Sequence, residues 1–150
     1  MADIKTKEER SRNMSAIHSK DTGPEVYFRK LLFTNGIRYR KNVSYIPGNP
    51  DLFLKKYNTA IFVNGCFWHR HTGCKYAYTP KSRLDFWENK FTNNKARDEK
   101  VRKELVNAGI RQLVIWECTI RKMKKDAAVR NDIIEAVICF LRSDLSYTEL

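Results

Sequence analysis

Features that place proteins in membranes or outside cells are missing from this sequence. Its 150 residues contain no apolar run near the roughly twenty residues that span a bilayer. Residues 1–7 lack the apolar segment of a secretory signal peptide, so we expect a cytosolic protein with no membrane partner. Without such a signal, the four cysteines are expected to be reduced thiols or metal ligands rather than disulfides.

Acidic residues are scarce beside basic ones. The chain has 29 Lys and Arg against 17 Asp and Glu, which gives a formal charge of +12 and a pI near 9.7. This balance favours a polyanionic partner, and nucleic acid is the first candidate. The alternative is a merely basic soluble protein, since net charge by itself identifies no particular partner.

The length suits one domain whose core needs no disulfides. We expect a basic N-terminal arm or short helix over residues 1–20 and a single domain over residues 21–150. Apolar periodicity and turn residues predict a mixed α/β order. The predicted elements are a helix over 22–36, strands over 37–43, 51–54 and 59–63, a helix over 83–108, a strand over 111–116 and a helix over 126–142. We therefore expect a mixed central sheet flanked by helices.

Two details of this pattern are specific. Strands 51–54 and 59–63 are close enough in sequence to form an antiparallel hairpin. Ser82 is positioned to cap the long polar helix, which the segment Thr92-Asn93-Asn94 can interrupt.

The densest chemistry lies in residues 64–74, directly after a predicted buried strand. Cys66, His71 and Cys74 form a Cys-x4-His-x2-Cys pattern, and Cys118 at the end of a later strand can complete it. Three thiolates and one imidazole suit a structural, tetrahedral zinc site. The alternative is three buried free cysteines and a surface histidine.

Two further residues near strand ends carry ambiguous signals. His69 is left over from the metal pattern, and a neutral imidazole beside a carboxylate suits proton transfer near pH 7. Asp51 follows a proline turn, where an aspartate often only ends the turn. Both residues can therefore be catalytic or merely solvent-facing.

Several separated motifs resemble those of the very-short-patch repair (Vsr) endonucleases. The resemblance covers roughly residues 6–122. It rests on Arg12-Asn13-Met14-Ser15-Ala16-Ile17, Asp21-Thr22, Glu25, Pro50-Asp51, Gly65-Cys66-Phe67-Trp68-His69, His71, Cys74, Phe86-Trp87, Arg97-Asp98 and Trp116-Glu117-Cys118. Agreement of this many motifs in order makes the resemblance specific.

The resemblance implies a restriction-endonuclease-like PD-(D/E)XK fold and a magnesium-dependent enzyme that nicks duplex DNA 5′ to the thymine of a T:G mismatch. By that resemblance, Asp51 and the carbonyl of Val63 bind Mg²⁺, which polarises the scissile phosphate. Glu25 holds metal-bound water. His69 acts as the base for the attacking water, and Asp98 supports it.

The resemblance also gives several side chains a role at the DNA. Phe67, Trp68 and Trp87 match residues that wedge into the duplex beside the mismatch, and Met14 matches one that enters from the opposite groove. Side chains of this kind insert most cheaply where stacking is already poor. Lys90 and Asn94 match positions near the mismatch. The alternative for the aromatic residues is ordinary core packing.

Two departures from the family pattern stand out. Asn64 replaces a histidine of some members, and the usual (D/E)XK carboxylate and lysine are absent around residues 61–64, as in the Vsr pattern itself. Two other functions remain open, namely a nicking nuclease with a different or relaxed specificity and a non-catalytic, zinc-stabilised DNA-binding protein. We expect a monomer, with mismatch-repair proteins as partners by family analogy.

Overall fold

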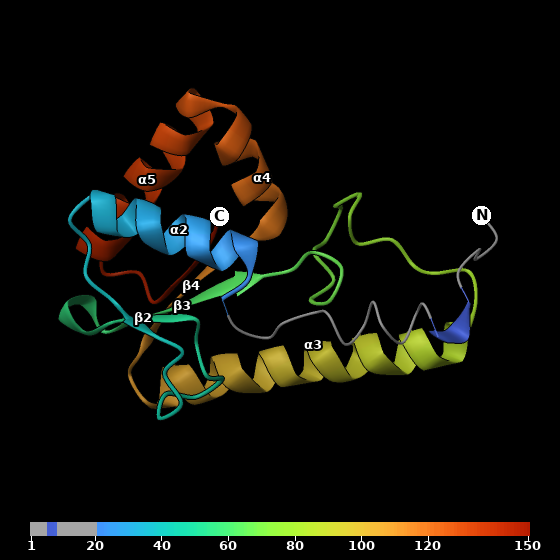
Figure 1. Ribbon diagram of the computed structural model, residues 1–150. Coiled ribbons are helices and arrows are strands. Elements are labelled where there is room, and N and C mark those ends of the chain that lie inside the picture. The colour runs from blue at the N-terminus through green and yellow to red at the C-terminus, as the bar shows by residue number, and fades with distance from the viewer. Residues whose placement is uncertain (1–5, 9–20) are drawn as a thin grey trace.

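The computed structural model describes residues 6–8 and 21–150 (Figure 1). Most of the predicted N-terminal arm, with Met14, therefore lies outside the described residues. The elements in chain order are α2 (Gly23–Thr34), β1 (Arg40–Lys41), β2 (Leu52–Leu54), the short 3-10 helix η1 (Lys55–Tyr57), β3 (Thr59–Asn64), α3 (Leu84–Asn107), β4 (Arg111–Trp116), α4 (Glu117–Lys125), α5 (Ala127–Arg142) and β5 (Tyr147–Glu149). In this part of the chain, no helix is long and apolar enough to cross a membrane.

The five strands form one mixed sheet in the order β1-β2-β3-β4-β5. β1, β2 and β3 are antiparallel neighbours, whereas β3, β4 and β5 run parallel. The predicted hairpin is confirmed, because Leu52 pairs with Ile61 and Leu54 with Thr59. Its connection is η1 followed by Asn58 in the left-handed conformation, which asparagine tolerates better than most residues.

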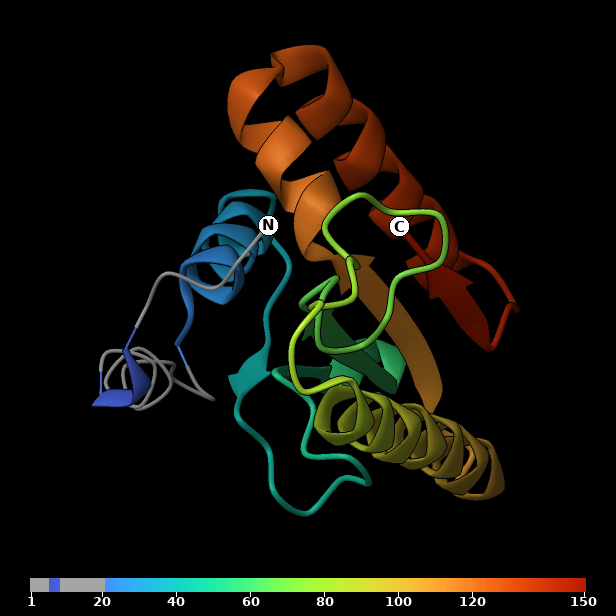
Figure 2. The ribbon, with the colours of Figure 1, turned by 90° about the vertical axis from the view of Figure 1, so that its right-hand side faces the viewer.

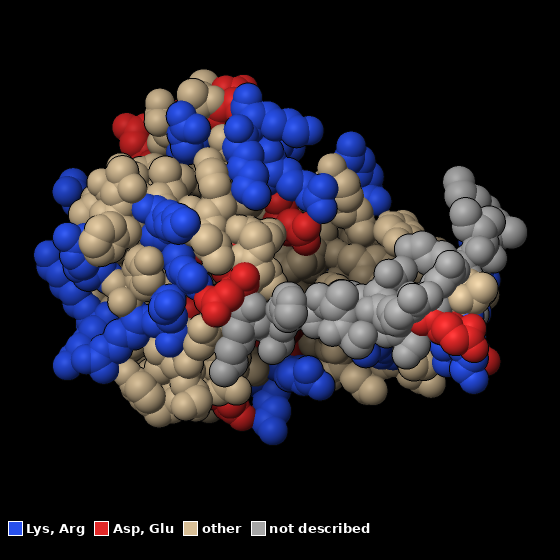
Figure 3. All heavy atoms as spheres, viewed as in Figure 1, with Lys and Arg blue, Asp and Glu red and all other residues tan. Residues whose placement is uncertain are grey.

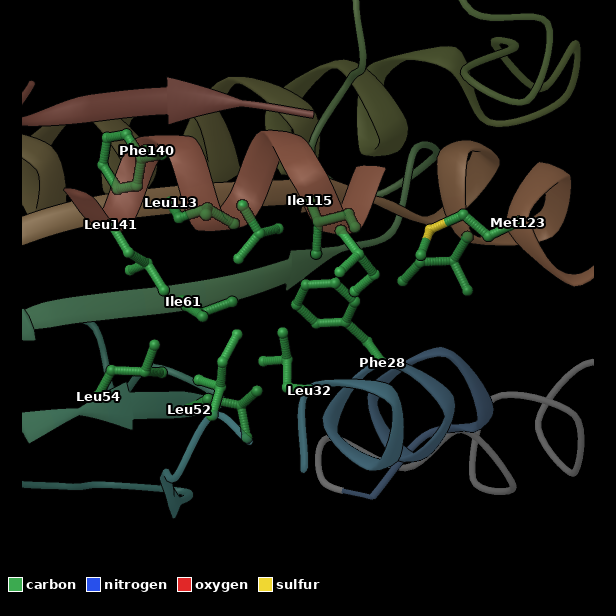
Figure 4. Close-up of a cluster of buried hydrophobic side chains, with 14 residues drawn as sticks. Phe28, Leu32, Leu52, Leu54, Ile61, Leu113, Ile115, Met123, Phe140 and Leu141 are labelled. Carbon is green, nitrogen blue, oxygen red and sulfur yellow. The ribbon is translucent and has the colours of Figure 1, made fainter. Parts of the chain in front are cut away.

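Helices cover both faces of the sheet, with α3 on one side and α2, α4 and α5 on the other (Figures 1 and 2). Successive side chains on a strand point to opposite faces, so Leu52 and Leu54 face one layer and Phe53 the other. The larger core joins strand residues to all three helices of the second layer (Figure 4). Its members include Phe28, Leu32, Leu52, Leu54, Ile61, Leu113, Ile115, Met123, Phe140 and Leu141.

The predicted strand over 37–43 is wrong in extent. Only Arg40 and Lys41 pair with β2, which is itself three residues long. Ile37, before β1 in the sequence, is buried in one hydrophobic core, and Val43, after β1, is buried in another. Their spacing in the sequence therefore reflects two packing contacts rather than one continuous strand.

Two predictions for the long helix are also wrong. α3 begins after Arg83, which is left-handed, and no side chain caps its start, so Ser82 is not the cap. The helix runs without interruption through residues 92–94. Buried Phe91 lies on one side of this polar segment, and the side chain of Asn94 is bonded to the loop after β3. These tertiary contacts outweigh the low helix propensity of the asparagines.

The sequence missed two elements. Glu117 and Cys118, expected at a strand end, form the first turn of α4. After α5, whose start is capped by Asp126, a short strand, β5, adds to the sheet beside β4. Residues beyond 125 therefore complete the sheet in addition to packing on it.

Candidate functional site

Parallel pairing of β3 and β4 brings two distant cysteines together. Asn64 of β3 is in register with Trp116 of β4, and Cys66 and Cys118 each follow two residues later. The backbone N–H of Cys118 donates to Sγ of Cys66 at 3.4 Å, although 52 positions separate these residues. The register of the sheet thus explains how the fourth predicted ligand joins the other three.

All four predicted zinc ligands lie in one cluster. The ligand atoms of Cys66, His71, Cys74 and Cys118 are within 4.8 Å of one another. Nδ1 of His71 is 3.4 Å from Sγ of Cys118. Zinc bonds of about 2.3 Å to sulfur place two tetrahedral sulfur ligands about 3.8 Å apart, so this cluster has the dimensions of such a site. It can hold a metal ion.

The protonation chemistry of the cluster favours a bound cation. Burial raises the pKa of the Cys66 thiol to about 12, so an isolated thiolate there is costly. Burial lowers the pKa of His71, which keeps its imidazole neutral and able to bind metal. Burial opposes ionisation of Cys74 too, but backbone N–H groups of Tyr76 and Ala77 help to lower its pKa.

Residues to which the sequence assigned no role at the metal cluster brace it. The His71 ring stacks on Trp116, with ring centres 4.1 Å apart and planes 5° apart. Nε1 of Trp116 donates to Oε1 of Glu149 at 3.1 Å. No motif signalled this contact, because Glu149 belongs to the unrecognised strand β5.

A cleft of about 870 Å³ opens beside the metal cluster. It gathers residues from α2, the ends of β2 and β3, the following loop and α3. Its lining includes most of the predicted catalytic and DNA-contacting residues, namely Glu25, Asp51, Val63, Trp68, His69, Lys90, Asn94 and Asp98.

Two carboxyl groups meet in the cleft. Oδ2 of Asp51 accepts a 2.7 Å hydrogen bond from the N–H of Val63, and Oε2 of Glu25 accepts one from the N–H of Asp21. Burial, with the nearby Glu25, raises the pKa of Asp51 from 3.8 to about 7. Among the described residues, no Lys or Arg forms a salt bridge with either group. This oxygen-rich site suits a hard cation such as Mg²⁺.

An oriented imidazole lies in the same cleft. Nδ1 of His69 is 2.7 Å from Oδ2 of Asp98 on α3. A carboxylate at Nδ1 favours the tautomer with the proton on that nitrogen, and this leaves Nε2 as a proton acceptor. Asn64, the departure from the family pattern, also lines this cleft, where its amide can hydrogen-bond water.

The predicted wedge residues form one aromatic cluster beside the cleft. The ring centre of Phe67 lies 5.0 Å from that of Trp68 and 5.4 Å from that of Trp87. Phe67 also contacts Tyr78 and the buried Phe91. Phe67, Trp68 and Trp87 are all half-buried, so these side chains combine packing with an accessible surface.

Polar groups from α3 hold and flank this cluster. Nζ of Lys90 is 5.4 Å from the ring centre of Trp68, within range of a cation–π interaction. Nδ2 of Asn94 donates to the carbonyl of Trp68 at 3.0 Å. Asn94 therefore fixes the loop that carries Trp68, a role its predicted DNA contact did not include.

The mixed sheet flanked by helices is the arrangement of a restriction-endonuclease-like fold, and its paired carboxyl groups come from α2 and from the residue before β2. The profile of the family described as DNA mismatch endonuclease Vsr matches residues 2–75.

Comparison with curated proteins gives the same family. The chain is 48% identical to the type II nicking enzyme V.NmeAIP of Neisseria meningitidis, over 81% of this chain and 86% of that protein. It is 38% identical to the DNA mismatch endonuclease Vsr of Escherichia coli, over 83% of this chain and 80% of that protein. It is 39% identical to the type II nicking enzyme V.XorIIP of Xanthomonas oryzae, over 87% of this chain and 96% of that protein. The chain belongs to the Vsr DNA mismatch endonuclease family and is a DNA endonuclease.

Proposed function

We propose that this endonuclease nicks one strand of duplex DNA 5′ to the thymine of a T:G mismatch in a Mg²⁺-dependent reaction. The observation that carries the proposal is one cleft containing the Asp51–Glu25 carboxyl pair and the His69–Asp98 pair. We propose further that it acts as a cytoplasmic monomer, with mismatch-repair proteins as partners by family analogy.

The carboxyl pair is the proposed Mg²⁺ site. Asp51 and the carbonyl of Val63 would hold the ion, and Glu25 would orient its water. The hydrogen bond from Val63 to Asp51 supports this pairing, because it keeps the backbone of β3 beside the carboxyl group. Bound Mg²⁺ supplies Lewis acidity at the scissile phosphate and at the leaving oxygen.

His69 is the proposed general base. Nε2 takes a proton from the attacking water, while Asp98 holds the ring and stabilises the imidazolium that forms. No lysine is then required for this step, in agreement with the absence of one from residues 61–64. Attack of this water on phosphorus breaks the bond between phosphorus and O3′, so the products are a 5′ phosphate and a 3′ hydroxyl.

The aromatic cluster provides the proposed mismatch preference. Trp68 lines the cleft, and the rings of Phe67 and Trp87 both pack against Trp68. Insertion of rings between base pairs costs a few kcal/mol of stacking, and less at a mispair. A T:G step would therefore admit the cluster more readily than a matched T:A step.

The metal cluster has a structural role in this proposal, and we propose that its ion is zinc. The loop from Cys66 to Cys74 carries both the wedge residues and His69. A metal joining this loop to Cys118 at the start of α4 would fix the wedge relative to the base.

Nicking of labelled duplexes that carry different mispairs tests the proposal. We expect Mg²⁺-dependent nicking of T:G and little of T:A. Asp51→Ala should abolish nicking yet retain DNA binding, because the basic surface and the aromatic cluster remain. Undiminished cleavage by this variant would refute the metal assignment, and binding without any cleavage by the wild type would favour the non-catalytic alternative.

A second candidate keeps the nuclease and changes its target. Two of the relatives are described as type II nicking enzymes rather than as mismatch endonucleases. These names state nicking but no mismatch, so they support nicking with a different or relaxed specificity as the second candidate. Varying the bases that flank T:G in the same assay separates these candidates.

A further inference from the structure

Tyr78 stands at the exposed end of the aromatic cluster. Its ring centre is 5.1 Å from that of Phe67, and 64% of the residue is exposed. Phe67 is enclosed more tightly, since Trp68, Trp87 and Phe91 surround it as well. Within the cluster, Tyr78 therefore offers far more free ring surface than Phe67.

The loop that carries Tyr78 is fixed by Arg70. The guanidinium donates to the carbonyls of Ala77 and Tyr78, both at 2.9 Å. It also donates to the carbonyl of Phe67 at 3.3 Å and to Oγ1 of Thr79 at 3.1 Å. These bonds tie the Tyr78 segment to the segment that carries Phe67.

Arg70 is also packed against the cluster. Its guanidinium carbon lies 3.9 Å from the ring centre of Phe91. With its donors directed to protein acceptors and one face on a ring, Arg70 serves to position the loop rather than to bind phosphate. The exposure of Tyr78 is consequently a property of a braced loop.

We propose that Tyr78 is a further DNA-contacting, specificity-determining residue, which stacks on a nucleobase loosened by the mismatch. This inference rests on the proposed function. Trp68 lines the cleft, whereas Phe67 and Tyr78 do not, so Tyr78 contacts the duplex on the side of the wedge away from Asp51. It acts on binding and mismatch preference rather than on bond cleavage.

Tyr78 can stack on a base because one face of its ring is exposed. Among the described residues, Phe67 is the ring that Tyr78 contacts, which leaves most of the phenol surface in water. A base that has lost part of its own stacking can cover that surface, and such contacts tolerate any base. A fully paired duplex offers no base in this state.

Tyr45 provides a matched control. It is 65% exposed, and its hydroxyl accepts a hydrogen bond from Arg40 of β1 rather than joining the aromatic cluster. Binding to T:G and T:A duplexes should be measured without added Mg²⁺, so that no nicking occurs while the metal cluster stays intact. Tyr78→Ala should weaken T:G binding about tenfold and T:A binding much less. Tyr78→Phe should bind like the wild type, and Tyr45→Ala should leave both affinities unchanged.

Arg70→Lys tests the positioning role, with metal content measured to show that the neighbouring cluster is intact. Arg70→Lys should weaken T:G binding. Combining it with Tyr78→Ala should weaken binding little further, because each change removes the same contact between Tyr78 and the DNA. Fully additive losses would overturn the positioning role.

The outcomes separate this inference from the proposed function. Suppose that the wild type prefers T:G duplexes, and that Tyr78→Ala binds them as tightly as the wild type or loses no more affinity than Tyr45→Ala. The inference about Tyr78 then fails, while the proposed function stands. If the wild type shows no preference for T:G, the proposed function fails and the inference with it.

Discussion

The environment of single carboxyl groups determines the chemistry of the cleft. Asp51 and Asp98 are both near His69, but Asp98 has the imidazole as a direct partner whereas Asp51 has a second carboxyl, Glu25. The pKa of Asp51 is consequently raised to about 7 by burial and by Glu25. A group in this state gains most from a bound cation.

This pKa predicts a pH-dependent stability in the absence of divalent metal. The folded-state pKa of about 7 exceeds the ordinary value of 3.8, so the folded protein binds the proton more tightly. The stability this proton contributes is fully present below about pH 4 and is lost as the pH rises through 7. Thermal unfolding from pH 5 to 8 should show a smaller decrease for Asp51→Asn than for the wild type.

Mg²⁺ provides the control for that experiment. At pH 8 it should raise the Tm of the wild type and leave Asp51→Asn unchanged, because ligand binding stabilises only a protein that holds the ligand. Equal pH slopes for the two proteins would contradict the assigned environment of Asp51.

The His69–Asp98 contact predicts an ordered series of rate losses. His69→Ala should lower the single-turnover nicking rate by about 10²- to 10⁴-fold, the usual contribution of a general base. Asp98→Asn should cost less, because it weakens the contact that orients the ring but leaves the base itself in place. Glu99→Gln is a suitable control, since Glu99 is exposed and pairs with Lys103. A rate that His69→Ala leaves unchanged would exclude this residue as the base.

At the scale of elements, the parallel pair β3–β4 organises the Cys/His cluster and the proposed Mg²⁺ site. Val63 of β3 donates its backbone N–H to Asp51. Cys66 and Cys118 each follow two residues after Asn64 and Trp116, the paired ends of the two strands. One register therefore fixes the carboxyl site and the thiol cluster relative to each other.

The four cysteines offer a matched test of the metal cluster. Cys118→Ser should remove the bound metal, loosen the loop after β3 and lower nicking, because three ligands hold zinc more weakly than four. Cys139→Ser should do none of this, as Cys139 is exposed on α5 and outside the cluster. Metal content and thermal unfolding measure both effects. Full metal content in purified Cys118→Ser would show that the cluster is not the metal site.

Elements with a strong local pattern could be predicted from the sequence. The predicted helix over 22–36 matches α2, and the predicted strands over 59–63 and 111–116 match β3 and β4. β5 could not be predicted, since its polar residues Tyr147–Glu149 become a strand only by pairing with β4. The continuity of α3 likewise depends on contacts distant in sequence, such as that of Asn94 with Trp68.

The site residues were predictable for a different reason. Closely spaced ligands and recurring motifs identified Cys66, His71, Cys74 and His69, and the structure brings them to one region. The family resemblance, rather than spacing, implied that Asp98 supports His69, and Nδ1 of His69 lies 2.7 Å from Oδ2 of Asp98. The bracing role of Arg70 depends on side-chain geometry that the sequence does not reveal.

At the scale of the whole molecule, charge should dominate the affinity for DNA. The net charge is +12, and Figure 3 shows Lys and Arg gathered over α4 and along the left-hand side of the view. Binding should weaken steeply with salt as counterions are released. Lys90→Ala should reduce the log–log salt slope by about one, because Lys90 lines the cleft.

Lys55→Ala is the matched control for that slope. Lys55 is exposed in η1, between β2 and β3, and does not line the cleft. Its removal should leave the slope near the wild-type value. Identical slopes for Lys90→Ala and the wild type would place Lys90 away from the phosphates.

The most direct test of the central claim is to map the cut in an end-labelled T:G duplex incubated with the protein and Mg²⁺. The proposed site predicts one nick, 5′ to the mismatched thymine, that Asp51→Ala does not make and a matched T:A duplex does not receive. Equal cutting of the fully paired duplex, or a cut that does not require Mg²⁺, would contradict it.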